Sequence, residues 1–161
     1  LLQSWKIVQQ KYPDWELSIY GKYDPKSNLV SLAKQLRIEN SVHFFEPVKN
    51  VEEKLLESSI FAFSSRFEGF GMVLIEAMAC GVPCVSFDCP CGPTSIIKDI
   101  EDGFLVANGD TDAFANKLME LIQKDEKRIL MGQAAKENVK RYLPETIMPQ
   151  WDKLFKKIIS I

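Results

Sequence analysis

The chain is poor in the residues that build metal centres and disulfide frameworks. Its 161 residues include one histidine and four cysteines, and all four cysteines lie in the short stretch from Cys80 to Cys91. They are separated by three, four and one residue, whereas zinc sites need paired spacings such as Cys-x2-Cys. The sequence therefore predicts no metal centre, and we expect reduced thiols, as in a cytosolic protein.

An excess of basic charge and a long apolar run are also missing. Twenty Lys and Arg residues stand against 22 Asp and Glu residues, which gives a net charge of −2. Proteins that bind nucleic acid or an anionic membrane normally carry a basic surface. No apolar run approaches the roughly 18 residues of a membrane span, and we expect no signal peptide. Nucleic acid is therefore excluded as the first hypothesis for a partner.

What the sequence does contain is an alternation of short apolar runs and amphipathic stretches. This alternation is typical of βαβ units and a parallel sheet. Strands are expected at 15–20, 42–45, 60–63, 84–87 and 103–106. Helices are expected at 1–11, 26–37, 51–58, 72–79 and 94–98, from Asp110, from Asp125 to about Tyr142, and around 151–158. The length fits one α/β domain over residues 1–161, a doubly wound parallel sheet with helices on both faces.

Local sequence also predicts where several helices begin. Asn50 and Glu53 have the spacing of a capping box, and Asp110 and Asp125 are expected to be N-caps. Residues 1–11 already resemble the middle of a helix and the first residue is not Met. We therefore expect the domain to be truncated at its amino terminus.

The loop at 64–71 is the strongest candidate for a binding site. Ligands of open parallel sheets bind outside the carboxyl ends of the strands, which directs attention to the loops at 21–25, 45–50, 64–71 and 88–93. Gly69 and Gly71 allow the backbone to approach a ligand closely. The apolar helix that follows begins with unpaired amides and a partial positive charge, so the sequence favours a diphosphate site without a basic side chain.

Two carboxylates accompany this turn. Glu68 precedes the helix, and Glu76 interrupts its otherwise apolar sequence. A carboxylate in an apolar helix is expected to be paired or to bind a ligand, because burying it alone is costly. The alternative is a purely structural tight turn, in which Glu68 only interacts favourably with the helix dipole. The residues by themselves do not decide between this turn and a binding site. Neither a GxGxxG fingerprint nor a Walker lysine is present, so dinucleotide and P-loop sites are not predicted.

The nineteen residues from 67 to 85 closely resemble the signature of glycosyltransferase family 4. That signature has two glutamates separated by seven residues in an EGFG…EAMA-x-G-x-P frame, and the similarity extends to segments 17–21, 42–48 and 102–106. The resemblance implies the GT-B arrangement of two Rossmann-like domains. This chain looks like the C-terminal, donor-binding half, with the acceptor-binding domain of the parent protein absent.

The resemblance also implies roles for individual residues. Glu68 would hold hydroxyls of the donor sugar as the catalytic candidate, and Glu76 would bind the ribose. The base would lie near Pro47 and Val48. The full set of implied nucleotide-sugar-binding residues is Glu76, Gly69, Phe70, Gly71, Met72, Val73, Leu74, Gly21, Pro47 and Val48.

The function implied is retaining transfer of a hexose from a nucleotide sugar, with UDP the expected nucleotide, to a glycan or lipid-linked acceptor. No metal and no further cofactor would be required. The family's strand ending in Gly-Arg, followed by a Lys, normally precedes the first helix and is absent here, so we expect this chain alone to be inactive. A cytoplasmic location is expected, with peripheral membrane contact made through the missing domain.

Two other functions remain open at this stage. The first is a sugar-nucleotide-binding module without transfer activity, which an upstream Gly-Arg…Lys segment in the parent protein would argue against. The second is an epimerase that acts on UDP-sugars on the same architecture. Release of a free epimerised sugar nucleotide without an acceptor would identify it.

Overall fold

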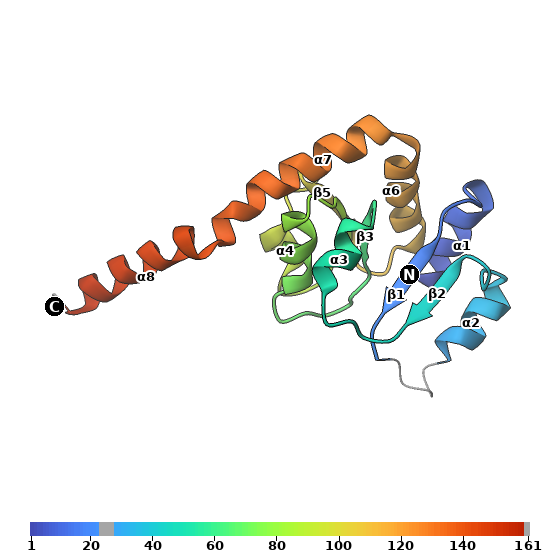
Figure 1. Cartoon of the computed structure of the whole chain (residues 1–161), viewed down its shortest axis with the longest axis horizontal. Helices are drawn as coiled ribbons and strands as arrows, with labels where there is room; N and C mark the ends of the chain where they lie inside the picture. The colour runs from blue at the N-terminus through green and yellow to red at the C-terminus, as the bar shows by residue number, and fades with distance from the viewer. Residues whose placement is uncertain (23–27, 160–161) are drawn as a thin grey trace.

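The computed structural model describes residues 1–22 and 28–159 (Figure 1). The strands are β1 (Leu17–Tyr20), β2 (Val42–Phe45), β3 (Phe61–Phe63), β4 (Cys84–Asp88) and β5 (Gly103–Ala107). The helices are α1 (Leu2–Lys11), α2 (Leu29–Leu36), α3 (Val51–Leu56), α4 (Met72–Ala79), α5 (Pro93–Ile96), α6 (Thr111–Gln123), α7 (Asp125–Asn138) and α8 (Pro144–Ile159), with a 3₁₀ turn at Val139–Tyr142. The expected α/β alternation is therefore confirmed, although the expected helix start at 26 and most of the loop at 21–25 lie outside the described residues.

All strand pairs are parallel, but the strands form two sheets. In one sheet β1 pairs with β2, so that Leu17 lies opposite Val42. In the other, β4 lies between β3 and β5. The predicted single sheet is thus divided between β1 and β3, and no strand among the described residues joins the two parts.

Helices cover both faces of the strands, as expected. Strand β4 is buried from Cys84 to Phe87, which explains its continuous apolar sequence. Its successive side chains point to opposite faces. Val85 and Phe87 pack with α1 and α6, whereas Cys84 packs with α4 and the end of α7.

Of the three N-caps predicted from the sequence, the structure confirms one. The Asp110 carboxylate accepts a hydrogen bond from the Ala113 amide at 2.9 Å and caps α6 as predicted. The capping box at Asn50 is wrong, because the Asn50 side chain makes no cap hydrogen bond. Asp125 is likewise no N-cap. It lies in the first turn of α7, where its carboxylate pairs with Arg128 at 2.8 Å.

The last helix, α8, lies apart from the rest of the molecule. Figure 1 shows it projecting away from the strands, and none of its residues is buried. The apolar stripe that includes Trp151 and Phe155 is about half exposed. No helix in the described part of the chain is long and apolar enough to cross a membrane.

Candidate functional site

The amino-terminal end of α4 has the geometry of an anion site. Gly71 caps the helix in the left-handed region, with φ 91°, and a Cβ there would lie 3.3 Å from the Leu74 side chain. The first helical hydrogen bond runs from the Leu74 amide to the Gly71 carbonyl at 2.9 Å. The amides of Met72 and Val73 come before it and have no partner within the helix. The Leu74 amide is engaged in that bond and the Leu74 side chain is fully buried in the core. The free donors are therefore the amides of Met72 and Val73.

The Glu68 carboxylate is held by a neighbour that the sequence did not single out as a partner. The Ser65 hydroxyl lies 2.6 Å from Glu68 Oε1 and 3.3 Å from the Phe67 carbonyl oxygen. A hydroxyl has one proton to donate, so the shorter contact with the carboxylate dominates. The spacing Ser-x-x-Glu was the available signal, since it brings the two side chains together in a tight turn.

The loops after β3 and β4 are fixed against each other. The Glu68 amide donates to the Pro90 carbonyl at 3.4 Å, and Gly92 lies directly against the Phe70 carbonyl. The Phe70 ring meets the edge of Tyr142 with centroids 5.9 Å apart, and the Tyr142 hydroxyl donates to a carbonyl of α5 at 2.5 Å. The loop with the glycine turn is therefore held by the loop after β4 and, through Tyr142, by the 3₁₀ turn after α7 and by α5.

Burial raises the pKa of the Cys89 thiol in the second of these loops, and the Glu68 carboxylate raises it further. A thiol with a raised pKa is a poor nucleophile. Cys89 is therefore a packing residue at the edge of the site.

Glu76 occupies a different environment from the one its sequence suggested. The side chain is exposed on the surface of α4, so the expectation of a carboxylate surrounded by apolar residues is wrong. The apolar neighbours Leu74, Ala77 and Met78 point into the core on the other side of the helix. Glu76 instead shares a face with Val73, one turn earlier.

Gly21, Pro47 and Val48 lie together at one groove. They border a cavity of about 840 Å³ between β1 and β3, which Val73 of α4 also lines. Gly21 follows β1 with φ 151° and donates to the Phe45 carbonyl at 3.1 Å. Pro47 and Val48 were predicted to lie near the base, and Gly21 was predicted to bind the nucleotide sugar. The structure brings all three to the groove that is also lined by Val73, in the first turn of α4. Glu68, Gly69 and Phe70 lie outside the groove lining, in the loop after β3.

One Asp-x-Asp pair occurs in the chain, Asp110 and Asp112 at the start of α6. Such pairs hold a divalent ion in some phosphate-binding sites. Here a carboxylate oxygen of Asp110 is engaged by the Ala113 amide, so the pair serves the helix start. This Asp-x-Asp pair lies at the start of α6, whereas the groups that face an anion at the start of α4 are backbone amides.

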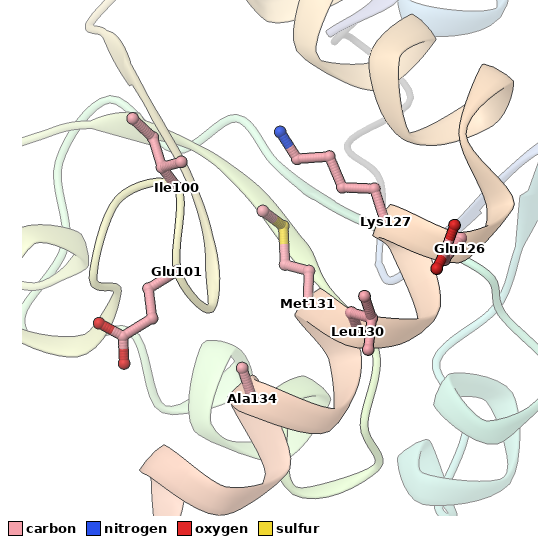
Figure 2. Close-up of a pocket in the computed structure, with 7 residues that line it drawn as sticks. All are labelled: Ile100, Glu101, Glu126, Lys127, Leu130, Met131 and Ala134. Atoms are coloured by element: carbon pink, nitrogen blue, oxygen red, sulfur yellow. The ribbon is translucent and has the colours of Figure 1, made fainter.

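A second depression lies between the β4–β5 connection and α7, with a volume of about 460 Å³ (Figure 2). Ile100, Leu130 and Met131 border it together with Lys127. The Lys127 ammonium already binds Glu120 at 2.8 Å and lies 4.9 Å from the centre of the Phe104 ring. Glu101 and Glu126 also line it, and the Glu101 carboxylate accepts a hydrogen bond from Asn138 at 2.9 Å.

Comparison with known proteins gives a consistent result. A model of the family described as glycosyl transferases group 1 matches residues 1–138. The amylovoran biosynthesis glycosyltransferase AmsD of Erwinia amylovora is 37% identical over 152 residues, which cover 94% of this chain and 42% of that protein. The chain therefore spans less than half the length of this relative.

Solved structures share the fold. A mutant of S. aureus TarM, solved with fondaparinux, α-GlcNAc-glycerol and UDP, superposes with a TM-score of 0.89 at 27% identity over 96% of this chain and 31% of that one. The C-terminal domain of a glycosyl transferase group 1 family protein (LpcC) from Francisella tularensis gives a TM-score of 0.78 at 26% identity. That match covers 86% of this chain and 75% of the domain.

Proposed function

The chain belongs to the glycosyl transferases group 1 family, and from this membership we propose that it is the C-terminal, donor-binding domain of a retaining family 4 glycosyltransferase with the GT-B arrangement. The similarity to the isolated C-terminal domain from Francisella tularensis supports the position in the parent protein. A cytoplasmic location is part of the proposal, since all four cysteines are unpaired, as in reducing compartments.

The observation that carries this proposal is the free amino-terminal end of α4 beside the groove of Gly21, Pro47 and Val48. The amides of Met72 and Val73, together with the helix dipole, favour a diphosphate. The groove then has room for the nucleoside, with the base near Pro47 and Val48. UDP is the nucleotide we propose, and the S. aureus neighbour solved with UDP supports this choice.

The two glutamates recognise hydroxyl groups in this proposal. Glu76 is exposed one turn beyond Val73, which leaves its carboxylate free to accept hydrogen bonds from the ribose. Glu68, held by Ser65, accepts hydrogen bonds from the donor sugar. Ionised carboxylates suit vicinal diols because each oxygen accepts strong, charge-assisted hydrogen bonds.

The proposed reaction moves a hexose from UDP to a hydroxyl of a glycan or lipid-linked acceptor. The bond between the anomeric carbon and the diphosphate oxygen breaks, and the electron pair leaves with UDP. A new bond forms from the acceptor oxygen to the same face of the sugar, and the hydroxyl proton is released. The α4 amides stabilise the charge that grows on the leaving diphosphate, without a metal.

The acceptor belongs to the rest of the parent protein. The chain spans 42% of the amylovoran glycosyltransferase, so a second, N-terminal domain is proposed to bind the acceptor. Without it the two reactants are not held together, which removes an advantage of up to ~7–11 kcal/mol. The 161-residue chain alone should therefore bind UDP without measurable transfer.

Calorimetric titration with UDP tests the proposal, on both the full-length protein and the 161-residue chain. We expect binding to both, unchanged when magnesium is replaced by a chelator. The Glu39→Gln variant lies at an exposed position in the turn before β2 and is the matched control for a Glu-to-Gln substitution at Glu76. It should bind UDP normally. A full-length protein that does not bind UDP would contradict the donor site, and binding abolished by the chelator would contradict its metal-free character.

A further inference from the structure

Tyr142 connects the 3₁₀ turn after α7 to the loop that precedes α4, although the two segments are far apart in sequence. The rings of Tyr142 and Phe70 meet edge to face, with centroids 5.9 Å apart and an angle of 80° between their planes. The Tyr142 hydroxyl donates to the Ser95 carbonyl of α5 at 2.5 Å. Phe70 immediately precedes Gly71, the residue that caps α4. Tyr142 therefore bridges α5 and the turn at which the free amides of the candidate site begin.

The loop before α4 is held at several points, and Tyr142 holds its last part. The Asn108 side chain donates to the Arg66 carbonyl at 3.2 Å, and the Glu68 amide donates to a carbonyl of the loop after β4 at 3.4 Å. These two bonds fix the backbone of the first part of the loop. The Phe70 ring is held by Tyr142 instead. Edge-to-face aromatic pairs have a preferred geometry, so this contact orients the ring as well as attracting it.

Arg141 fixes the position of Tyr142 itself. The Arg141 guanidinium lies over the Tyr142 ring, 4.8 Å from its centre. It also donates to the Asn138 carbonyl at 3.0 Å and to the Ile96 carbonyl of α5. The 3₁₀ turn is thus joined to α5 by two neighbouring side chains, those of Arg141 and Tyr142.

A buried carboxylate anchors the other end of this series of contacts. Asp102, in the turn before β5, is fully buried, and it accepts hydrogen bonds from the Lys98 amide at 2.7 Å and the Asn138 side chain at 3.1 Å. A buried carboxylate is costly without such partners, so Asn138 is held where α7 ends. Contacts therefore run without interruption from Asp102 through Asn138 and Arg141 to Tyr142.

Tyr142 does more than fill the core. The core contact of the 3₁₀ turn is made by Val139, which is buried in the same cluster as Leu74 of α4. Tyr142 is only partly buried at the border of this cluster. Its hydroxyl and its ring edge reach the two segments beside the candidate site, since a Cβ at Gly71 would lie 3.8 Å from the Ile96 side chain of α5.

We propose that Tyr142 is a positioning residue for the donor site and acts through Phe70. It holds the Phe70 ring beside α5 and so fixes the Gly71 turn that follows. The free amides in the first turn of α4 then keep one direction toward the diphosphate. Preorganised donors favour binding, because the cost of ordering them is met before the ligand arrives. The inference deepens the proposed function and rests on it, since the site must bind a nucleotide for this positioning to matter.

Two substitutions in the 161-residue chain test the proposal. Tyr142→Leu removes the ring contact and the hydroxyl, whereas Tyr142→Phe keeps the ring. In Tyr142→Leu we expect the Glu68 amide to exchange its hydrogen about tenfold faster, while the Phe114 amide, bonded to the Asp110 carbonyl in α6, is the unchanged internal control. The Kd for UDP should rise roughly tenfold in Tyr142→Leu and by less than about threefold in Tyr142→Phe.

A control and a double variant separate positioning from general destabilisation. Tyr12 packs against the other core cluster, far from the loop before α4, so Tyr12→Leu should lower the melting temperature and leave Glu68 exchange and UDP affinity unchanged. If Tyr142 acts through Phe70, their effects on affinity are not additive. The double variant Phe70→Leu with Tyr142→Leu should then bind UDP no more weakly than Phe70→Leu alone.

The outcomes distinguish this proposal from the proposed function. A parent chain that does not bind UDP contradicts the donor site, while faster Glu68 exchange in Tyr142→Leu still supports the hold of Tyr142 on the loop. Three results would overturn the role of Tyr142. These are parent-like exchange at Glu68 in Tyr142→Leu, faster exchange with unchanged UDP affinity, and additive losses of affinity in the double variant.

Discussion

A Cβ on Gly92 would lie 2.9 Å from the carbonyl carbon of Phe70, and closer still to its oxygen. No side chain tolerates such a separation, so the loop after β4 approaches the loop after β3 only because position 92 is glycine. This contact joins the loop that precedes α4 in the chain to the loop that follows β4, both at the carboxyl edge of the strands. It fixes the backbone from which the glycine turn of the candidate site begins.

Replacing Gly92 with alanine should therefore separate the two loops. We expect Gly92→Ala to lower the free energy of unfolding by ~1–3 kcal/mol, because the clash is with backbone atoms that cannot rotate away. UDP binding should weaken as well, since the Phe70 backbone shifts. Thermal unfolding and calorimetry measure the two effects, and an unchanged melting temperature would show that the loops are not held by this contact.

Gly69→Ala is the matched substitution at the same loop and should behave differently. A Cβ at Gly69 meets no atom within 4 Å, so the folded protein accommodates it and the free energy of unfolding should change by less than about 0.5 kcal/mol. If Gly69 is where the backbone approaches the donor, the added methyl group should weaken UDP-sugar binding by roughly tenfold. Normal donor binding by a stable Gly69→Ala variant would place the ligand elsewhere.

Glu76→Gln tests the proposed ribose contact. Because Glu76 is exposed, stability should be nearly unchanged, while UDP binding should weaken by ~1–3 kcal/mol through loss of charge-assisted hydrogen bonds. Calorimetry on the variant and on the Glu39→Gln control measures the difference. A lower melting temperature with unchanged affinity would instead assign Glu76 a structural role.

Glu120 should make the domain sensitive to acid. Its carboxylate binds Lys127 at 2.8 Å and Lys117 at 3.4 Å, and these hydrogen bonds, led by that of Lys127, lower its pKa to about 2. A carboxyl whose pKa is lower in the folded state stabilises the protein above its unfolded pKa. That stability is lost as the pH falls through the range from about 4.5 to about 2.

The measurement for Glu120 is the free energy of unfolding as a function of pH. We expect Glu120→Gln to remove ~1–2 kcal/mol at neutral pH, a value reduced from the full linkage energy because the side chain is partly exposed. The variant and the parent should converge as the pH falls through about 2, because Glu120 then becomes protonated in the folded state as well as in the unfolded state. Burial raises the pKa of Asp102 and gives the opposite slope, which cancels in the comparison. The exposed pair of Glu137 with Lys140 provides the control, and Glu137→Gln should have little effect.

Much of this protein could be predicted from its sequence because the relevant patterns are local. The alternation of apolar runs with amphipathic stretches determined the order of strands and helices, and Asp110 determined the start of α6. The glycine turn before α4 was also predictable, since a left-handed residue before a helix depends on a few neighbouring residues.

Other features were decided by contacts between distant segments, which a local pattern does not encode. The apolar sequence around Glu76 suggested burial, yet the way α4 packs turns this side chain outward while Leu74 faces the core. The Asn50 capping box failed although its spacing was correct. Likewise, only the folded chain shows that Gly92 meets Phe70 and that β1 and β3 face an open groove. Each outcome depends on how segments far apart in sequence pack, and packing of that kind overrides local preference.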